Sequence, residues 1–374
     1  DFALLGLWMA ASAVVSVLVS LRYETTLVLP DSAAEAAALY RLAARVIAGL
    51  SLALAGLALV LQQWLPRGID ALGLGGLSAW LPWAVLAGGC SAWMGLSLAW
   101  LNRQQAYGAM NRARLVQAGL TVVGVTLSGS LDWHAGLWVS HGLGAFGGAC
   151  AAALALRADL PPRTLAWRDV ARRHRAAPLY LLPSALMDTV TQQLPLLLAL
   201  QWFGSQPAGQ FTLAWRALAL PMFMAAAAVG AVFYQRFARL ASQPAAARAL
   251  LRKTWGWGLL GWALLCIAMV LMAEPLFGWV FGAIWQPAGA MAAVLTPMVA
   301  AMALSSATSG ALIVLGGQRY VPLFGLAMLL GRPLVFWWGS GDGDLLAALR
   351  LWVALEMVLI VLYNALIWRR LRVA

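Results

Sequence analysis

A small set of charged and amide side chains interrupts the long apolar runs of this sequence, and these side chains are its candidates for chemistry. An arginine or aspartate at the centre of a membrane-spanning helix costs about 2.5–3.5 kcal/mol on insertion scales. Such a residue therefore needs a charged partner, a water-filled cavity or a route to the interface. The candidates are Arg22, Asp188, Gln192, Arg216, Arg332, Arg350 and Glu356.

Arginine is well suited to an anionic substrate, because its guanidinium offers forked donors that match a phosphate. Arg216 lies about eight residues, or roughly 12 Å, inside its apolar run, too deep for easy snorkelling. We expect it either to contact substrate or to form a structural ion pair. Arg332 and Arg350 lie about 8–9 Å deep, which favours snorkelling to the interface for both. Arg22 is either a third substrate-contacting candidate, together with Arg216 and Arg332, or part of an interfacial pair with Glu24.

Two carboxylates lie near the middle of apolar runs. Asp188, Gln192 and Pro195 share one helical face by their three-to-four spacing, which indicates a polar cavity face or a buried Asp satisfied by a neighbouring helix. Glu356 and Asp188 are the candidates for ion coupling, because a protonated or paired carboxylate is tolerated at that depth.

No catalytic constellation is present. The sequence has no HExxH, GxSxG or P-loop motif, and its three cysteines lie far apart. His134 and His141 flank the end of one run, where interfacial or packing roles are favoured over ligation. We therefore expect neither an enzyme nor a bound metal or cofactor.

The composition requires lipid as the solvent for most of the chain. Of 374 residues, 63% are hydrophobic and 10% charged, with a mean hydropathy of +0.82, whereas soluble domains are about 45–50% apolar and about 25% charged. Several of the 20 tryptophans lie at the ends of apolar runs, as in an aromatic belt. With roughly 20 residues for each span, we predict about eleven spans, at 2–20, 41–65, 78–101, 114–131, 135–157, 177–203, 208–235, 255–273, 289–315, 320–338 and 345–368.

The positive charge orients these spans. Nearly all arginines fall on one side, including a run from Arg157 to Arg175 and the C-terminal Arg369 to Arg372, whereas Arg67 stands nearly alone on the other. The positive-inside rule places the basic side and the C-terminus in the cytoplasm of a bacterial inner-membrane protein. The net charge of +12 is therefore an orientation signal, not a sign of a nucleic-acid partner.

A weak internal repeat divides the chain into two lobes. Residues 2–41 resemble 211–252, with Tyr23 matching Tyr234 and Arg41 matching Arg252. We predict an N-terminal lobe at 1–157, a basic cytoplasmic linker with a short surface helix at 158–176, and a C-terminal lobe at 177–374. The odd number of spans, the missing methionine and the repeat register indicate that the sequence lacks a first span. The predicted fold class is an all-α polytopic membrane protein, a two-lobed helical bundle of the twelve-span type.

Several segments are similar to one transporter family. The segment Arg22-Tyr23-Glu24 with Leu29-Pro30 resembles the second span and the following loop of polysaccharide-biosynthesis flippases, in the multidrug/oligosaccharidyl-lipid/polysaccharide exporter superfamily. The opening Asp1 to Leu5 is similar to the entry into that span. Segments similar to the seventh and eighth spans are Pro183 to Ala185, Gln192 to Pro195, Gly209 to Phe211, Leu220-Pro221 and Val232 to Arg236.

This resemblance implies an alternating-access flippase with two six-helix lobes. Its cargo would be an undecaprenyl-diphosphate-linked oligosaccharide for surface polysaccharide such as O-antigen, held in a cationic cavity with Arg216, Arg332 and Arg22 as candidates. The implied partners are this polyprenyl-linked glycan, the bilayer, a glycan polymerase and a chain-length regulator. The alternatives are a multidrug/cation antiporter of the same superfamily, a membrane glycan polymerase or ligase, which would need a large outer loop, and a scaffold in a glycan assembly complex.

Overall fold

The computed structural model describes residues 2–27, 30–64, 80–131, 133, 135–156, 166–175, 177–240, 243–315, 317 and 320–373. No strand is present in these ranges, where helices make up nearly the whole structure. Predictions on Asp1, Leu29, Arg67, His134 and Arg157 lie outside the described residues. By their contacts, the helices divide into two compact units, Ala3–Gln193 and Leu194–Ala374.

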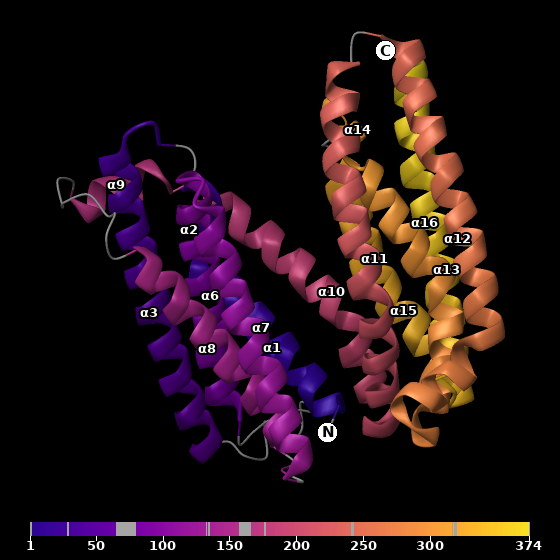
Figure 1. Cartoon of the computed structure of the whole chain (residues 1–374), viewed down its shortest axis with the longest axis horizontal. Coiled ribbons are helices and arrows are strands. Elements are labelled where there is room, and N and C mark those ends of the chain that lie inside the picture. The colour runs from indigo at the N-terminus through magenta and orange to yellow at the C-terminus, as the bar shows by residue number, and fades with distance from the viewer. Residues whose placement is uncertain are drawn as a thin grey trace. The chain divides into compact units, whose positions relative to one another are not determined.

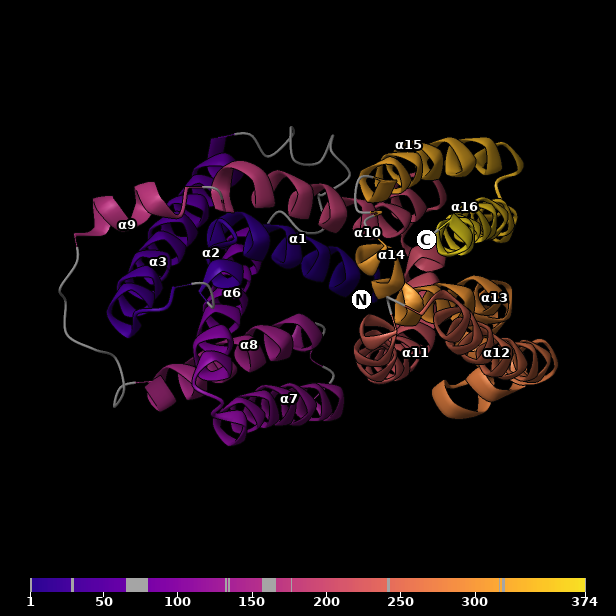
Figure 2. The same ribbon diagram turned by 90° about the horizontal axis from the view of Figure 1, so that it is seen from above.

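Unit 1 is a helical bundle in which α6 packs against α3 and α8, and α7 lies alongside α8 (Figures 1 and 2). Its helices are α1 (Phe2–Ser20), α2 (Tyr23–Thr26), α3 (Ala33–Trp64), α6 (Leu81–Arg103), α7 (Tyr107–Ser130), α8 (Gly136–Leu156), α9 (Trp167–Arg173), the π-helix η1 (Ala177–Leu181) and the start of α10 (Leu182–Phe203). The core joins α3 to α6 through buried apolar side chains and a Tyr40–Ser97 hydroxyl pair at 3.1 Å.

Unit 2 is arranged around α13, which packs against α11, α12 and α16. Its helices are the rest of α10, then α11 (Ser205–Arg239), α12 (Pro244–Phe281), η2 (Ala283–Trp285), α13 (Gln286–Thr308), α14 (Gly310–Val314), α15 (Val321–Gly339), η4 (Ser340–Asp342) and α16 (Leu345–Val373). Buried Ala226, Ala303 and Ala307 join α11 to α13. Small residues of this kind let membrane helices approach closely.

The predicted spans correspond to long helices. Among the described residues, nine helices are long and apolar enough to cross a membrane. The other two predicted spans coincide with α7 and α10, which have 24 and 22 residues and are more polar. Several span boundaries were wrong. Three helices begin 7 to 11 residues before the predicted span starts at 41, 114 and 255, because α3, α7 and α12 start at Ala33, Tyr107 and Pro244. The span predicted at 289–315 is interrupted at Ser309.

The basic segment forms the short helix that the sequence predicts. Helix α9 packs on α3, where Glu35 accepts hydrogen bonds from Arg173 Nη1 at 3.0 Å and from His174 Nε2 at 3.3 Å. The exposed Trp167 ring lies beside the Arg168 guanidinium, with 5.3 Å between the ring centroid and Cζ. The hydrogen bonds from Arg173 and His174 to Glu35 therefore hold the end of α9 against α3. The predicted lobe boundaries stay a prediction.

Gly289 allows α12 and α13 to pack closely, and we expect Gly289→Ala to lower the melting temperature of the purified protein. A Cβ there would lie 2.5 Å from the Ala273 carbonyl oxygen and 2.7 Å from Glu274 Cα, so backbone would have to move. Overpacking of this kind costs about 1–3 kcal/mol. Gly261→Ala on α12 is the control, because its Cβ meets nothing within 4 Å. Equal melting temperatures for the two variants would contradict the close packing.

Candidate functional site

A buried ion pair lies within unit 2. Arg332 on α15 donates from Nε to Glu356 Oε1 on α16 at 2.7 Å, and the two side chains are 4% and 0% exposed. Trp352, one turn before Glu356, donates from its indole Nε1 to the same oxygen at 3.0 Å. One carboxylate oxygen therefore accepts hydrogen bonds from a guanidinium and an indole, while Oε2 has no partner among the described residues.

Aromatic rings surround this pair. The Arg332 guanidinium lies over the Trp352 ring at 5.6 Å. Trp352 packs against Phe211, Trp215 and Phe336, with ring centroids 5.5–6.0 Å apart. Because Phe211 and Trp215 belong to α11, the cluster joins three helices of unit 2. Apolar walls of this kind strengthen the attraction between the two charges and penalise any state in which one of them is unpaired.

The position of Arg332 corrects the sequence interpretation. Snorkelling to the interface was expected for Arg332, and it is wrong, because the guanidinium is buried and paired with Glu356. Arg350 is exposed, as snorkelling requires. The ion pair gives Glu356 a structural role, whereas substrate contact by Arg332 and ion coupling by Glu356 stay predictions.

The polar face of α10 carries an internal hydrogen bond. Gln192 Nε2 donates to Asp188 Oδ2 at 2.9 Å, and both side chains are exposed. The predicted shared face is therefore confirmed for these two residues, and the alternative of a buried Asp188 is wrong. Pro195, which was placed on the same face, is buried. The division between the units falls directly after Gln193, so Asp188 and Gln192 are described with unit 1.

The other two arginine candidates differ in their surroundings. Arg216, on α11 of unit 2, is half-buried and interacts with its neighbours. Arg22, in unit 1, lies in the left-handed region at φ 59° between α1 and α2, and its Nη1 forms an ion pair with Glu24 Oε1 at 3.0 Å. The predicted Arg22–Glu24 pair is thus confirmed. Among the candidate residues, the structure therefore brings Asp188 and Gln192 together in unit 1, and Arg332 and Glu356 together in unit 2.

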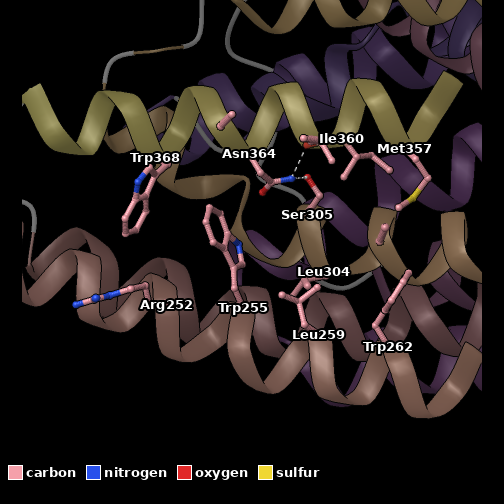
Figure 3. A pocket seen from close by; sticks show the side chains of 13 residues that line it. Arg252, Trp255, Leu259, Trp262, Leu304, Ser305, Met357, Ile360, Asn364 and Trp368 are labelled. Carbon is pink, nitrogen blue, oxygen red and sulfur yellow. Dashed lines mark hydrogen bonds between the residues drawn. The ribbon is translucent and has the colours of Figure 1, made fainter. Parts of the chain in front are cut away.

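Sequence reasoning missed two cavities, one in each unit. In unit 1, a cavity of about 460 Å³ between α1, α6 and α8 is walled by Trp8, Trp80, Trp83 and Trp138. In unit 2, a cavity of about 570 Å³ is walled by α12, α13 and α16, with Arg252 at its rim (Figure 3). The only feature of the sequence that could have indicated these cavities was the set of tryptophans at span ends. We interpreted those tryptophans as an aromatic belt and not as cavity walls.

Two further observations concern ligands. Among the described residues, no three His, Cys, Asp or Glu side chains lie close enough together to hold a metal ion. His141 lies with Nδ1 2.8 Å from the Leu137 carbonyl oxygen in its own helix, in keeping with the packing role expected for it.

Comparison with known proteins identifies the fold. No family model and no curated protein matches the chain. A solved structure described as the inward-facing conformation of a multidrug resistance MATE family transporter of the MOP superfamily is similar, with a TM-score of 0.71 and 12% identity. The match covers 100% of this chain and 88% of that chain. The chain is therefore a multi-pass helical membrane protein with a MATE transporter fold, which confirms the predicted fold class.

Proposed function

We propose that this protein is an exporter that moves a polyprenyl-diphosphate-linked oligosaccharide across the bacterial inner membrane by alternating access, with its C-terminus in the cytoplasm. The transporter fold and the flippase-like segments from Gln192 to Pro195 and from Val232 to Arg236 support this function. The observation that carries it is Arg216, a half-buried arginine within a membrane-spanning helix. Arginine inside a span marks a substrate path more often than a lipid-facing surface.

In this mechanism the guanidinium of Arg216 pairs with a phosphate oxygen of the cargo. A guanidinium forms two parallel hydrogen bonds to such a group, which lowers the cost of bringing a diphosphate into the membrane. The exposed Asp188–Gln192 pair supplies an acceptor and an amide suited to sugar hydroxyls. The polyprenyl chain stays in the bilayer. Arg332 and Arg22 stay the other two candidates for contact with the cargo.

A second candidate function is multidrug/cation antiport. The similar solved structure is described as a multidrug resistance transporter, and that likeness favours antiport as much as it favours lipid-linked glycan export. Exposed Asp188 gives this candidate a carboxylate for an organic cation. The two candidates differ in the sign of the charge that their substrate carries.

Reconstitution separates the two functions. The purified protein in liposomes is given a fluorescent polyprenyl-diphosphate oligosaccharide, and its appearance in the opposite leaflet is followed by reductive quenching. We expect leaflet exchange well above that of protein-free liposomes, and no proton- or sodium-driven transport of a cationic dye. Dye transport without leaflet exchange would overturn the proposal in favour of antiport. Cleavage or polymerisation of the glycan would favour a membrane enzyme.

A further inference from the structure

The cavity in unit 2 opens on the surface of a membrane-spanning bundle. It has a volume of about 570 Å³, within the range of about 300–1,000 Å³ that small-molecule sites occupy. Its lining is almost entirely apolar and comes from α12, α13 and α16 (Figure 3). Leu259 and Val361 line it while remaining 54% and 61% exposed, so the opening lies on the outer surface of these helices.

Hydrogen bonds hold the walls of this cavity in place. Trp262 donates from Nε1 to the Pro297 carbonyl oxygen at 2.8 Å, and Trp255 donates from Nε1 to Thr308 Oγ1 at 3.3 Å. Asn364 donates from Nδ2 to Ser305 Oγ at 3.0 Å, the contact drawn as a dashed line in Figure 3. Two indole rings and one amide are therefore fixed between helices, which gives the cavity walls a defined shape.

One end of the cavity is cationic. Arg252 lies at the end where the Trp255 and Trp368 rings face each other, with centroids 6.1 Å apart (Figure 3). Lys253 follows Arg252 in the chain, and Arg369 follows Trp368 on α16. The acidic residue of the same helix, Glu274, is 22 positions from Arg252, or roughly 33 Å along α12. This end therefore attracts anions.

An apolar cavity with a cationic rim and two tryptophans beside it matches the chemistry of an amphiphile at a membrane interface. We propose that this cavity binds one hydrocarbon chain of an anionic glycerophospholipid, with the phosphate held by Arg252. The positive-inside bias of the sequence places Arg252 on the cytoplasmic side, so the lipid comes from the inner leaflet. This site is separate from Arg216 and does not depend on the cargo.

Native mass spectrometry of the full chain in detergent tests the site. Delipidated protein is titrated with phosphatidylglycerol and with phosphatidylcholine of the same chains. We expect tighter binding of phosphatidylglycerol and an about tenfold loss of its affinity in Arg252→Gln, because a hydrogen bond to a charged group contributes about 1.5–3 kcal/mol. Arg236→Gln, at an exposed arginine of α11 outside the cavity, is the matched control.

A second pair of variants tests the chain-binding part of the cavity. Ala365 lines it, so Ala365→Leu fills space and should weaken binding of both phospholipids at least fivefold. Ala354→Leu, at an exposed alanine of the same helix outside the cavity, should leave binding unchanged. Equal affinity for the two headgroups, or equal losses in a variant and its control, would overturn the proposal. Displacement of phosphatidylglycerol by a polyprenyl phosphate at lower concentration would overturn the assignment to a glycerophospholipid.

Discussion

Glu356→Gln is expected to lower the stability of the protein by about 3–5 kcal/mol, the usual effect of removing one partner of a buried ion pair. Glutamine keeps the size of the side chain and can still accept from Trp352, but it leaves the Arg332 charge uncompensated. Arg332 is 4% exposed and lies against the Trp352 ring, so water cannot replace the lost carboxylate. The measurement is the thermal melting temperature of the detergent-purified protein.

Two further variants separate loss of charge from loss of packing. Glu274→Gln removes the same charge from an exposed position on α12 and should change the melting temperature little. The double variant Arg332→Met/Glu356→Gln should recover most of the loss, because no unpaired arginine then remains. Equal melting temperatures for Glu356→Gln and Glu274→Gln would show that the pair does not stabilise unit 2.

The helices of this protein are largely predictable from hydropathy alone, because lipid requires each spanning segment to satisfy its own backbone hydrogen bonds. That requirement explains why all eleven predicted spans coincide with helices of 19 or more residues. Boundaries were harder to predict. The alanine-rich stretch before residue 41 is amphipathic and was placed outside the span, yet alanine is the best helix former and the stretch is continuous with the span in α3.

The contacts between polar side chains inside the spans were predictable only where they are local. Asp188 and Gln192 are one helical turn apart, so their spacing indicates a shared face directly. Arg332 and Glu356 lie on different helices, and depth alone suggested snorkelling for Arg332. Their positions in the sequence could have predicted the pair. Arg332 and Glu356 each lie twelve residues from Asp344, in the turn between the two helices. In an antiparallel hairpin such residues reach the same depth.

The cavities could not be predicted from one sequence, because each needs the relative placement of three helices. Arg252 and Trp368 are separated by 116 positions, and nothing in the local pattern of α12 or α16 indicates that they share one cavity end. The weak internal repeat aligned Arg252 with Arg41 in sequence but predicted no function for Arg252. Tertiary packing therefore supplied the information that composition and periodicity lacked.

Arg216→Ala is expected to reduce leaflet exchange of the lipid-linked oligosaccharide by about 10- to 100-fold. A charge-assisted hydrogen bond contributes about 1.5–3 kcal/mol, and the guanidinium can form two of them to one phosphate. Arg216→Lys should retain part of the rate, because it keeps the charge but loses the forked geometry. The rate is measured in liposomes at equal protein density.

The control for this prediction lies on the same helix. Arg239 is the exposed last residue of α11, so Arg239→Ala removes an equal charge without touching the interior of the span. We expect it to exchange lipid at the wild-type rate. An Arg216→Ala protein with the wild-type melting temperature and the wild-type exchange rate would remove Arg216 from the substrate path. The case for an anionic cargo would then rest on Arg332 and Arg22, which form ion pairs with Glu356 and Glu24.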